Sequence, residues 1–470
     1  MGNRIVLSSL VAAALVAGCS FIPTYERPDA PIPASYPEAQ VNAVPQLAAD
    51  IGWRDYFAEP RLRTLIESAL DNNRDLRVAT LQIEQARAAF QLRRADTYPR
   101  VGVIANATRA PSVTTGDLTN SFSTGLAVSA WEIDFFGRIA SLKEQALAQY
   151  LATQEGRNAA QVSLVAAVAS GWLNLLADEV LMDLSRQTLA SREESVRLTQ
   201  MRLTAGVVSE LDLRQAQALV QAARATLAQQ TRQRARDENA LALLVGQALP
   251  GDIRGSLPGS TLSDAPAMSP LPAGLPSELL NRRPDIRQAE QQLIAANANI
   301  GAARAAFFPN ISLTAQAGTA SGELSGLFKS GSWGFSIAPS LLMPLFDAGR
   351  NQANLENAQT TRSIAVAQYE KAVQTAFREV SDALAGRATL GEQAQAQSLQ
   401  VEAVTARLQL SDLRYRNGVS NYLDLLDAQR SLFTAQQTLV LVQLEQLQNQ
   451  VTMFKTLGGG ATQEVVRPSR

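Results

Sequence analysis

Two long stretches of this chain contain no proline, residues 112–249 and 345–467. A proline inside a helix costs about 3 kcal/mol, so proline-free stretches of this length predict long helices. Prolines crowd instead into residues 23–60 and 250–284, which separate the helical parts. One continuous helix over residues 138–203 would be about 100 Å long at 1.5 Å per residue. A coiled-coil spacer needs such a length, and a compact soluble domain does not.

Apolar residues recur at helical spacing in both stretches, which places them on one face of each helix. They are Val165, Val168, Trp172, Leu176, Val180 and Leu184 in the first stretch, and Tyr369, Val373, Phe377, Val380 and Leu384 in the second. Alanine, which favours helix, is abundant in both. Both stretches are therefore expected to form closely packed helices.

The two halves of the chain are copies of each other. RLTAGVVSELDLRQAQ (202–217) aligns without a gap with RYRNGVSNYLDLLDAQ (414–429), and upstream residues 94–95 align with residues 304–305. Chance does not keep one register over such a span, so one unit is used twice. The resulting segments are a signal peptide (1–18), a lipidated extended segment (19–60), repeat 1 (61–250), a proline-rich linker (251–272), repeat 2 (273–460) and a C-terminal tail (461–470).

Each repeat is expected to contain a helix, two strands and a long helical hairpin. The strand candidates alternate between apolar and polar residues, and they are residues 101–110 and 122–134 in repeat 1 and residues 310–320 and 333–343 in repeat 2. Beyond residue 19 no run of eighteen apolar residues offers a membrane-spanning helix, so a membrane crossing would have to use strands. Four strands cannot close a barrel, whereas three chains would supply twelve. A small soluble hairpin packed on the helices is the alternative.

The N-terminus has the pattern of an export signal. MGNRIVLSSLVAAALVAG (1–18) carries one early positive charge and an apolar run that is too short to span a membrane. It ends at LVAGC, which resembles a bacterial lipobox, so the thiol of Cys19 is expected to take a lipid. Ser20 follows in place of an aspartate, which in lipoprotein sorting favours the outer membrane. An ordinary signal peptide with an incidental cysteine is the alternative.

Composition argues against an enzyme. The 470 residues include no histidine and one cysteine, so the commonest general base, nucleophile and metal ligands are missing. A formal net charge of −1 gives no electrostatic reason to expect nucleic acid as a partner. We therefore expect no catalytic residues, no metal site and no cofactor apart from a covalent lipid on Cys19.

Several longer motifs point to one family. They are GCSFIPTYERP (18–28), IDFFGR (133–138), NIGAARAAFFPNISLTA (299–315), YLDLLDAQRSLF (422–433) and LGGG (457–460). With them the chain resembles the outer-membrane factor (TolC) family, in the lipoprotein branch that includes OprM and CusC. The resemblance implies an α+β membrane protein whose homotrimer forms a 12-stranded β-barrel on a 12-helix periplasmic α-barrel. It also implies a location in the outer membrane, lipid-anchored and membrane-spanning, with a long periplasmic extension.

The hairpin turns are the candidate functional sites. Gly206 and Gly418 permit the left-handed conformation that ends a helix. Ser209 and Ser420 are expected to cap the helices that follow.

Capping also gives a sufficient reason for Asp212 and Asp424, which lie near the positive helix ends. It does not explain Asp427, which aligns with Gln215 in the other repeat.

The resemblance assigns roles to these turns at the periplasmic end of a tunnel. It implies a gate made of Asp212, Tyr415, Leu423, Asp424, Asp427 and Arg430, and adaptor contacts at Gly206, Val207, Gly418 and Val419. Tyr415 would pair with Asp212. The family's gate arginine is Ser420 here, so Arg430 would have to substitute for it. Three chains would then give a ring of six carboxylates, a cation-binding constriction.

The function implied is the exit duct of a tripartite efflux system, which conducts small toxic compounds from an inner-membrane pump, of the RND type, and a periplasmic adaptor. Drugs or solvents are the favoured cargo, and metal ions are the alternative. A periplasmic adaptor lipoprotein also carries a lipobox and a helical hairpin, but this chain has two hairpins and membrane-type strands. A lipoprotein hydrolase is a third hypothesis, which the missing histidine disfavours.

Overall fold

A computed structural model describes residues 20–36, 51–111, 116–251, 253, 262, 268, 271 and 280–460. The predicted signal peptide, Cys19, the C-terminal tail and most of the linker lie outside these residues. The chain divides into two compact units, the first drawn from Met1–Ala30, Leu81–Gln154 and Gln288–Lys371 and the second from the other segments. Each unit takes residues from both sequence repeats, so the compact units cut across the duplication.

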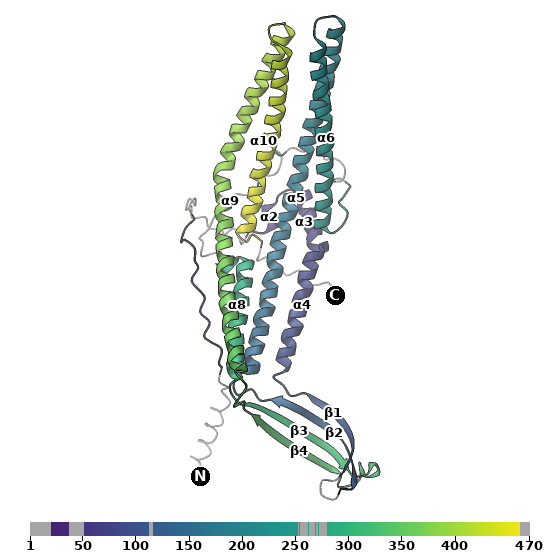
Figure 1. Ribbon diagram of the computed structural model, residues 1–470, viewed down its shortest axis with the longest axis vertical. Coiled ribbons are helices and arrows are strands. Elements are labelled where there is room, and N and C mark those ends of the chain that lie inside the picture. Colours follow the sequence, from purple (N-terminus) through teal and green to yellow (C-terminus); the bar gives the residue numbers. More distant parts are fainter. Residues whose placement is uncertain are drawn as a thin grey trace. The chain divides into compact units, whose positions relative to one another are not determined.

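The first unit contains a four-stranded antiparallel sheet (Figure 1). Its strands are β1 (Val101–Pro111), β2 (Leu118–Glu132), β3 (Asn310–Ser321) and β4 (Trp333–Leu342), in that spatial order. The two middle strands come from different repeats, so the duplicated hairpins join edge to edge into one sheet.

Cross-strand pairing gives the sheet one apolar and one polar face. Val103 pairs with Leu126, Leu126 with Ala317, and Ala317 with Phe335, so these side chains share a face. The opposite face carries Asn106, Ser123, Thr314, Gln316, Ser336 and Ser340, which follow from the same register. The strand alternation expected from the sequence is therefore present in both repeats, including the less cleanly patterned first one.

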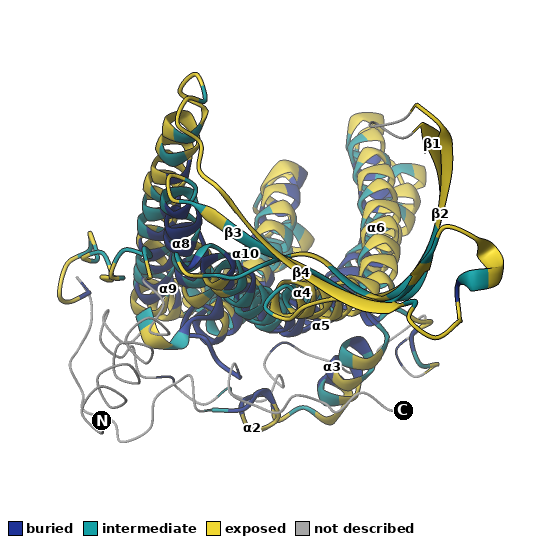
Figure 2. Cartoon of the chain, turned by 90° about the horizontal axis from the view of Figure 1, so that it is seen from below, coloured by how far each residue is buried: buried dark blue, intermediate teal, exposed yellow. Residues whose placement is uncertain are grey.

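Large apolar residues of the sheet are exposed, and the strands in Figure 2 are mostly coloured as exposed (yellow) or intermediate (teal). Val103 is 78% exposed, Phe335 68% and Ile337 63%. An apolar surface of this kind marks a membrane or protein contact, because water disfavours it.

Two glycines allow the middle strands to pair. A Cβ on Gly125 would lie 2.3 Å from the carbonyl oxygen of Ala317, and one on Gly318 would lie 2.1 Å from that of Thr124. Any side chain at either position would push β2 and β3 apart. Further along β2 the register shifts between Val128 and Trp131, which forms a bulge.

The two longest helices are α5 (Arg138–Thr204) and α9 (Arg350–Arg416), each of 67 residues. Both begin in the first unit and end in the second. Each turns back into a shorter helix, α6 (Glu210–Val245) or α10 (Tyr422–Thr456), and so makes a hairpin (Figure 1). The long helices predicted from the proline-free stretches are present.

Shorter helices precede each strand pair. They are α2 (Trp53–Tyr56), which comes before the first repeat, α3 (Pro60–Asn72) and α4 (Arg74–Ala95) at the start of that repeat, and α8 (Pro284–Ala305) in the second. In the second unit an aromatic cluster joins α2 to the end of α10, with Tyr56 stacked on Phe454 at 4.7 Å and Phe57 edge-on to it at 5.4 Å. These rings are almost completely buried, so they anchor the segment that precedes repeat 1 to the end of repeat 2.

The described N-terminal segment packs along α8 in an extended conformation. Phe21 stacks on Phe308 at 4.6 Å, Asn297 donates to the carbonyl of Pro23, and Arg27 pairs with Glu290 at 2.7 Å. These contacts fix the chain directly after Cys19 to the first unit.

Among the residues that the structure describes, one helix, α5, contains an eighteen-residue window that is apolar enough to cross a membrane, and more than half of that window is buried. The helix carries the core residues Val165, Val168, Ala169, Trp172, Leu173 and Leu175. Packing inside the chain accounts for its apolar character. The sequence expectation of no spanning helix counted only uninterrupted apolar runs, and for that reason it did not register this window.

Candidate functional site

The two hairpin turns have the same backbone. Gly206 and Gly418 have φ angles of 75° and 71°, in the left-handed region. The amide of Val207 donates to the carbonyl of Arg202, and the amide of Val419 donates to that of Arg414, each at 2.9 Å. Together these features make a Schellman motif at the end of each long helix.

Both turns present an apolar tip to solvent. Val207 is 72% exposed and Val419 66% exposed. A Cβ added to either turn glycine would meet no atom within 4 Å. Glycine is therefore required there by its φ angle and not by crowding.

The caps after the turns differ from expectation in one repeat. Ser209 caps α6 in a capping box with Asp212, as predicted. In the second repeat the cap of α10 is Asn421, whose side-chain oxygen accepts from the amide of Asp424 at 3.0 Å. The prediction of Ser420 as this cap was wrong, because α10 begins at Tyr422 and the capping residue must directly precede it.

The predicted contact between Tyr415 and Asp212 is not made. Within the part of the chain that the structure describes, the hydroxyl of Tyr415 is buried without a hydrogen-bond partner. Its ring packs instead against Tyr422 at 5.3 Å and under the guanidinium of Arg202 at 4.9 Å. Asp212 is occupied locally, since its carboxylate accepts from both the amide and the hydroxyl of Ser209.

Asp427 pairs with Arg407, a partner that was not predicted from the sequence. Its carboxylate lies 2.5 Å from the guanidinium of Arg407, across the hairpin between α9 and α10. Both side chains are about half exposed. The hairpin itself gives the signal, because it brings oppositely charged residues of its two helices, each a few turns or less from the connection, close together.

Arg430 faces another arginine. Arg430 itself is exposed. The pKa of Arg192 is lowered, first by the burial of Arg192 and then by the nearby charge of Arg430. Arg192 is buried, lies over the ring of Phe433 at 5.6 Å and donates to the carbonyl of Leu219 at 3.1 Å. The arginine on α5 thus ties the first hairpin to the second.

The hairpins pack on each other close to their turns. A buried cluster joins Ala216 of α6 to Tyr422, Leu425 and Leu426 of α10. Beside it lies a cavity of about 330 Å³ between α5, α9 and α10, lined by Thr199, Arg202, Tyr415 and Tyr422 among others. Burial raises the pKa of Tyr422. Leu423 and Asp424 point away from this contact and are exposed.

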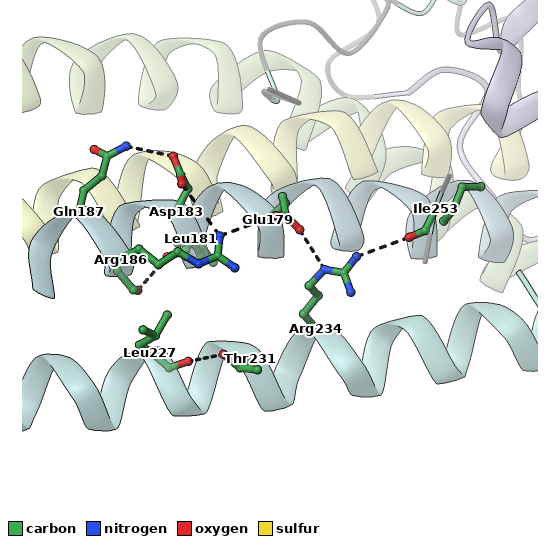
Figure 3. Close-up of polar contacts among 10 residues, drawn as sticks. Glu179, Leu181, Asp183, Arg186, Gln187, Leu227, Thr231, Arg234 and Ile253 are labelled. Carbon is green, nitrogen blue, oxygen red and sulfur yellow. Dashed lines mark hydrogen bonds and ion pairs between the residues drawn. The ribbon is translucent and has the colours of Figure 1, made fainter. Parts of the chain in front are cut away.

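A second charged cluster lies inside the first hairpin (Figure 3). Arg234 of α6 is buried, 2.9 Å from the carboxylate of Glu179 on α5 and 2.8 Å from Glu238. Next to it, Asp178 is buried with one carboxylate oxygen unpartnered among the described residues. Burial, followed by the hydrogen bond and charge of Asp237, raises the pKa of Asp178 to about 7. No motif or spacing in the sequence indicates this cluster.

A duplicated chain that combines a two-faced antiparallel sheet with paired helical hairpins has the construction of an outer-membrane channel subunit. The family model described as "Outer membrane efflux protein" matches residues 65–247 and 275–459, once in each repeat. The chain belongs to the outer membrane efflux protein family.

Individual relatives agree with this assignment. The antibiotic efflux pump outer membrane protein ArpC and the toluene efflux pump outer membrane protein TtgC, both of Pseudomonas putida, are 44% identical over 468 residues, covering 97% of this chain and 96% of each relative. The open-state MtrE outer membrane channel of Neisseria gonorrhoeae has a TM-score of 0.86 at 41% identity, covering 94% of this chain and 99% of that one. The predicted family, fold class and function as an outer-membrane efflux channel are confirmed.

Proposed function

We propose that three copies of this chain form the exit duct of a tripartite efflux system. The observation that carries the proposal is the sheet, which has one exposed apolar face and one polar face in a chain of this family. Three such sheets supply twelve strands, enough to close a barrel with the polar face toward the lumen. The two hairpins of each chain supply the twelve helices of the periplasmic tunnel.

The partners proposed are a periplasmic adaptor and an inner-membrane pump of the RND type. The exposed tips at Gly206, Val207, Gly418 and Val419 are the proposed adaptor contacts, because they are apolar, uncrowded and alike in both hairpins. Conduction is passive, and catalysis by the chain is not part of the proposal.

The proposed gate is the exposed start of α10. Leu423, Asp424 and Asp427 all lie on its solvent side, and in a trimer they would form an apolar ring and six carboxylates. The pair of Asp427 with Arg407 reduces the net charge of that ring. Arg430, one turn further along α10, adds positive charge beside the ring. Asp212 completes the gate from the first hairpin, where it holds the cap at Ser209, and Tyr415 does so from α9, where it packs on Tyr422.

The proposed cargo is organic. ArpC is described as an antibiotic efflux protein and TtgC as a toluene efflux protein, which favours drugs or solvents over metal ions. Among the described residues no group of three or more acidic, histidine or cysteine side chains is placed to hold a metal ion.

The proposed anchor is a lipid on Cys19, which the resemblance to a lipobox supports. Changing Cys19 to serine should abolish incorporation of labelled palmitate and leave the precursor uncleaved. Efflux should survive at least in part, because the barrel also holds the protein in the membrane. Palmitate labelling that persists in the serine variant would rule out this anchor.

Transport is tested by deleting the gene, restoring it on a plasmid, and measuring efflux of a fluorescent drug and tolerance of toluene. The deletion strain should accumulate the drug and lose tolerance, and restoration should reverse both. Chemical cross-linking of outer-membrane fractions should give trimers. An unchanged efflux rate in the deletion strain, with no redundant duct expressed, would contradict the proposal.

A further inference from the structure

A cavity of about 320 Å³ opens where the first strand pair meets the helices of the first unit. Its lining includes Arg93 of α4, Arg100 directly before β1, Trp131 of β2 and Arg138 of α5. Neither the efflux function nor the gate uses these residues. The volume is within the range of ligand-binding sites.

Positive charge exceeds negative charge in this cavity, which we call the basic corner. Arg93 and Arg100 share one carboxylate, that of Asp96, at 3.6 Å and 2.7 Å. Arg138 has its own partner, Glu132, at 2.6 Å. Three guanidinium groups thus face two carboxylates.

The arginines lie outside their acidic partners. The side chains of Arg93 and Arg100 are 54% and 82% exposed, whereas that of Asp96 is 30% exposed. Arg138 is 40% exposed over a Glu132 that is only 16% exposed. The open side of the basic corner therefore presents unused guanidinium donors and net positive charge.

Trp131 adds a donor that lacks an acceptor. Its indole nitrogen is buried, and no described residue accepts a hydrogen bond from it. A buried donor without an acceptor is costly, so a bound group with acceptor oxygens would be favourable. Guanidinium and indole donors together fit a phosphate oxygen cluster.

The basic corner lies at the edge of the apolar face of the sheet. Trp131 pairs with Leu313 and so lies on the same face as Leu126 and Phe335. Tyr98, which also lines the cavity, is 63% exposed. Aromatic and basic side chains at the end of a membrane-spanning segment are typical of the headgroup level.

The second repeat does not reproduce this site. Its equivalent corner holds a cavity of about 250 Å³ lined by Ala306, Phe308 and Asn310 where the first repeat has Asp96, Tyr98 and Arg100. The basic corner therefore occurs once in the described part of each chain, and the duplicated fold does not require it.

We propose that the basic corner binds the phosphate of an anionic phospholipid in the periplasmic leaflet of the outer membrane. The acyl chains would lie along the apolar face that begins at Val101 and Val103, and the headgroup would satisfy Trp131 and the outer arginines. This inference rests on the proposed placement of the sheet in that membrane. Lipid binding to the purified protein is measured without transport, so the two proposals fail separately.

The experiment is native mass spectrometry and thermal shift on the delipidated, detergent-purified protein, titrated with phosphatidylglycerol, phosphatidylcholine or inorganic phosphate. Phosphatidylglycerol should bind most tightly. R93Q/R100Q should weaken its binding about 25-fold, since each basic side chain near an anionic lipid surface contributes about fivefold. W131F keeps an aromatic ring, although a smaller one, and removes the N–H donor, so it should weaken binding about fivefold.

The matched control is R87Q, which removes one exposed positive charge from α4 outside the cavity and should bind as the parent does. If R87Q loses as much affinity as R93Q/R100Q, or phosphatidylcholine binds as tightly as phosphatidylglycerol, the site is not specific and the proposal is wrong. Inorganic phosphate binding as tightly as the lipid would also overturn it, since the basic corner would then be an ion site. Loss of folding in R93Q/R100Q leaves W131F and R87Q as the deciding pair.

Discussion

The two helical hairpins share a backbone but differ in what they bury. Their long helices have 67 residues each, their return helices 36 and 35, and their turn glycines nearly the same φ. Between α5 and α6 the first hairpin encloses Arg234, Glu179 and Asp178. At the aligned positions the second hairpin has Gln446, Gly391 and Leu390, all uncharged.

This contrast shows that the hairpin geometry is independent of the interior chemistry. Gly391 faces Gln446, whose amide nitrogen would be 3.8 Å from a Cβ added to that glycine. The second hairpin thus has an exposed glycine and a half-buried, neutral glutamine at the positions where the first has a buried ion pair. Buried ion pairs seldom add stability over apolar packing, so the first hairpin carries a charge cluster that its fold does not require.

The largest expected effect comes from breaking the ion pair. Arg234→Ala should destabilise the protein by about 3–5 kcal/mol, because Glu179 stays buried without its closest guanidinium. Gln446→Ala at the aligned position of the second hairpin is the control and should cost about 1 kcal/mol or less, because it removes an uncharged side chain that is only half-buried. Denaturant unfolding followed by helical circular dichroism measures both.

A double variant sharpens this test. Replacing Arg234 and Glu179 together by methionine should recover most of the loss, since neither member of the ion pair is then left buried without its partner. Equal losses of unfolding free energy in Arg234→Ala and Gln446→Ala would show that the ion pair makes the first hairpin no different from the second.

The next effect is a pH dependence confined to the first hairpin. The pKa of Asp178 is raised from its ordinary 3.8 to about 7, chiefly by burial and then by Asp237. Between these two values the folded protein holds a proton that the unfolded chain has released, so stability should fall as pH rises through this window and level off above pH 7. The groups facing Asp178 with charge are Asp237, Glu179 and Arg234.

Asp178→Asn should flatten that slope, because the amide donates to Asp237 at every pH. The melting temperature from pH 4 to pH 8.5 measures it, and the infrared band of a protonated carboxyl at pH 5 should disappear in the variant. Leu390→Asn, at the aligned position of the second hairpin, should leave the slope unchanged. A parent protein with the same slope as Asp178→Asn would mean that the carboxyl pair holds no proton.

The third test asks whether the turns are equivalent. Gly206→Val and Gly418→Val should each cost about 1–2 kcal/mol from left-handed strain alone, since no neighbour lies within 4 Å. The double variant should still form trimers but lose efflux, because the adaptor can no longer seat on either tip. Ala205→Val, at a residue that does not have positive φ, is the control. Full efflux by the double variant would place the adaptor contacts elsewhere.

The smallest expected effect on stability comes from the exposed pair of the second hairpin. Arg407→Ala should cost at most about 1 kcal/mol, as exposed ion pairs do, yet it leaves Asp427 uncompensated at the proposed gate. Single-channel recordings should then show stronger cation selectivity and cation block, and Asp424→Ala with Asp427→Ala should show weaker. Ser195→Ala, aligned with Arg407 in the first hairpin, should change neither property. If Arg407→Ala and the double variant of Asp424 and Asp427 both keep the cation selectivity of the parent, these residues are not part of the gate.

Sequence alone indicated the local features of this protein. The spacing of prolines and apolar residues predicted the long helices, glycine with valine marked both turns, and alternation predicted the strands. Each of these follows from backbone preferences within a few residues. The cap of α10 was the exception, because Ser420 was predicted and the structure has Asn421, the residue that aligns with Ser209.

Only the tertiary structure decided which side chains meet. Tyr415 packs on Tyr422 and Arg202 and not on Asp212, Asp427 finds Arg407, and Arg234 meets Glu179 across a hairpin. In the basic corner, Trp131 and Arg93 line one cavity although helix, strand and bulge separate them. The physical reason is that a contact between elements depends on their register and rotation, which the packing of the whole chain sets and which no single segment encodes.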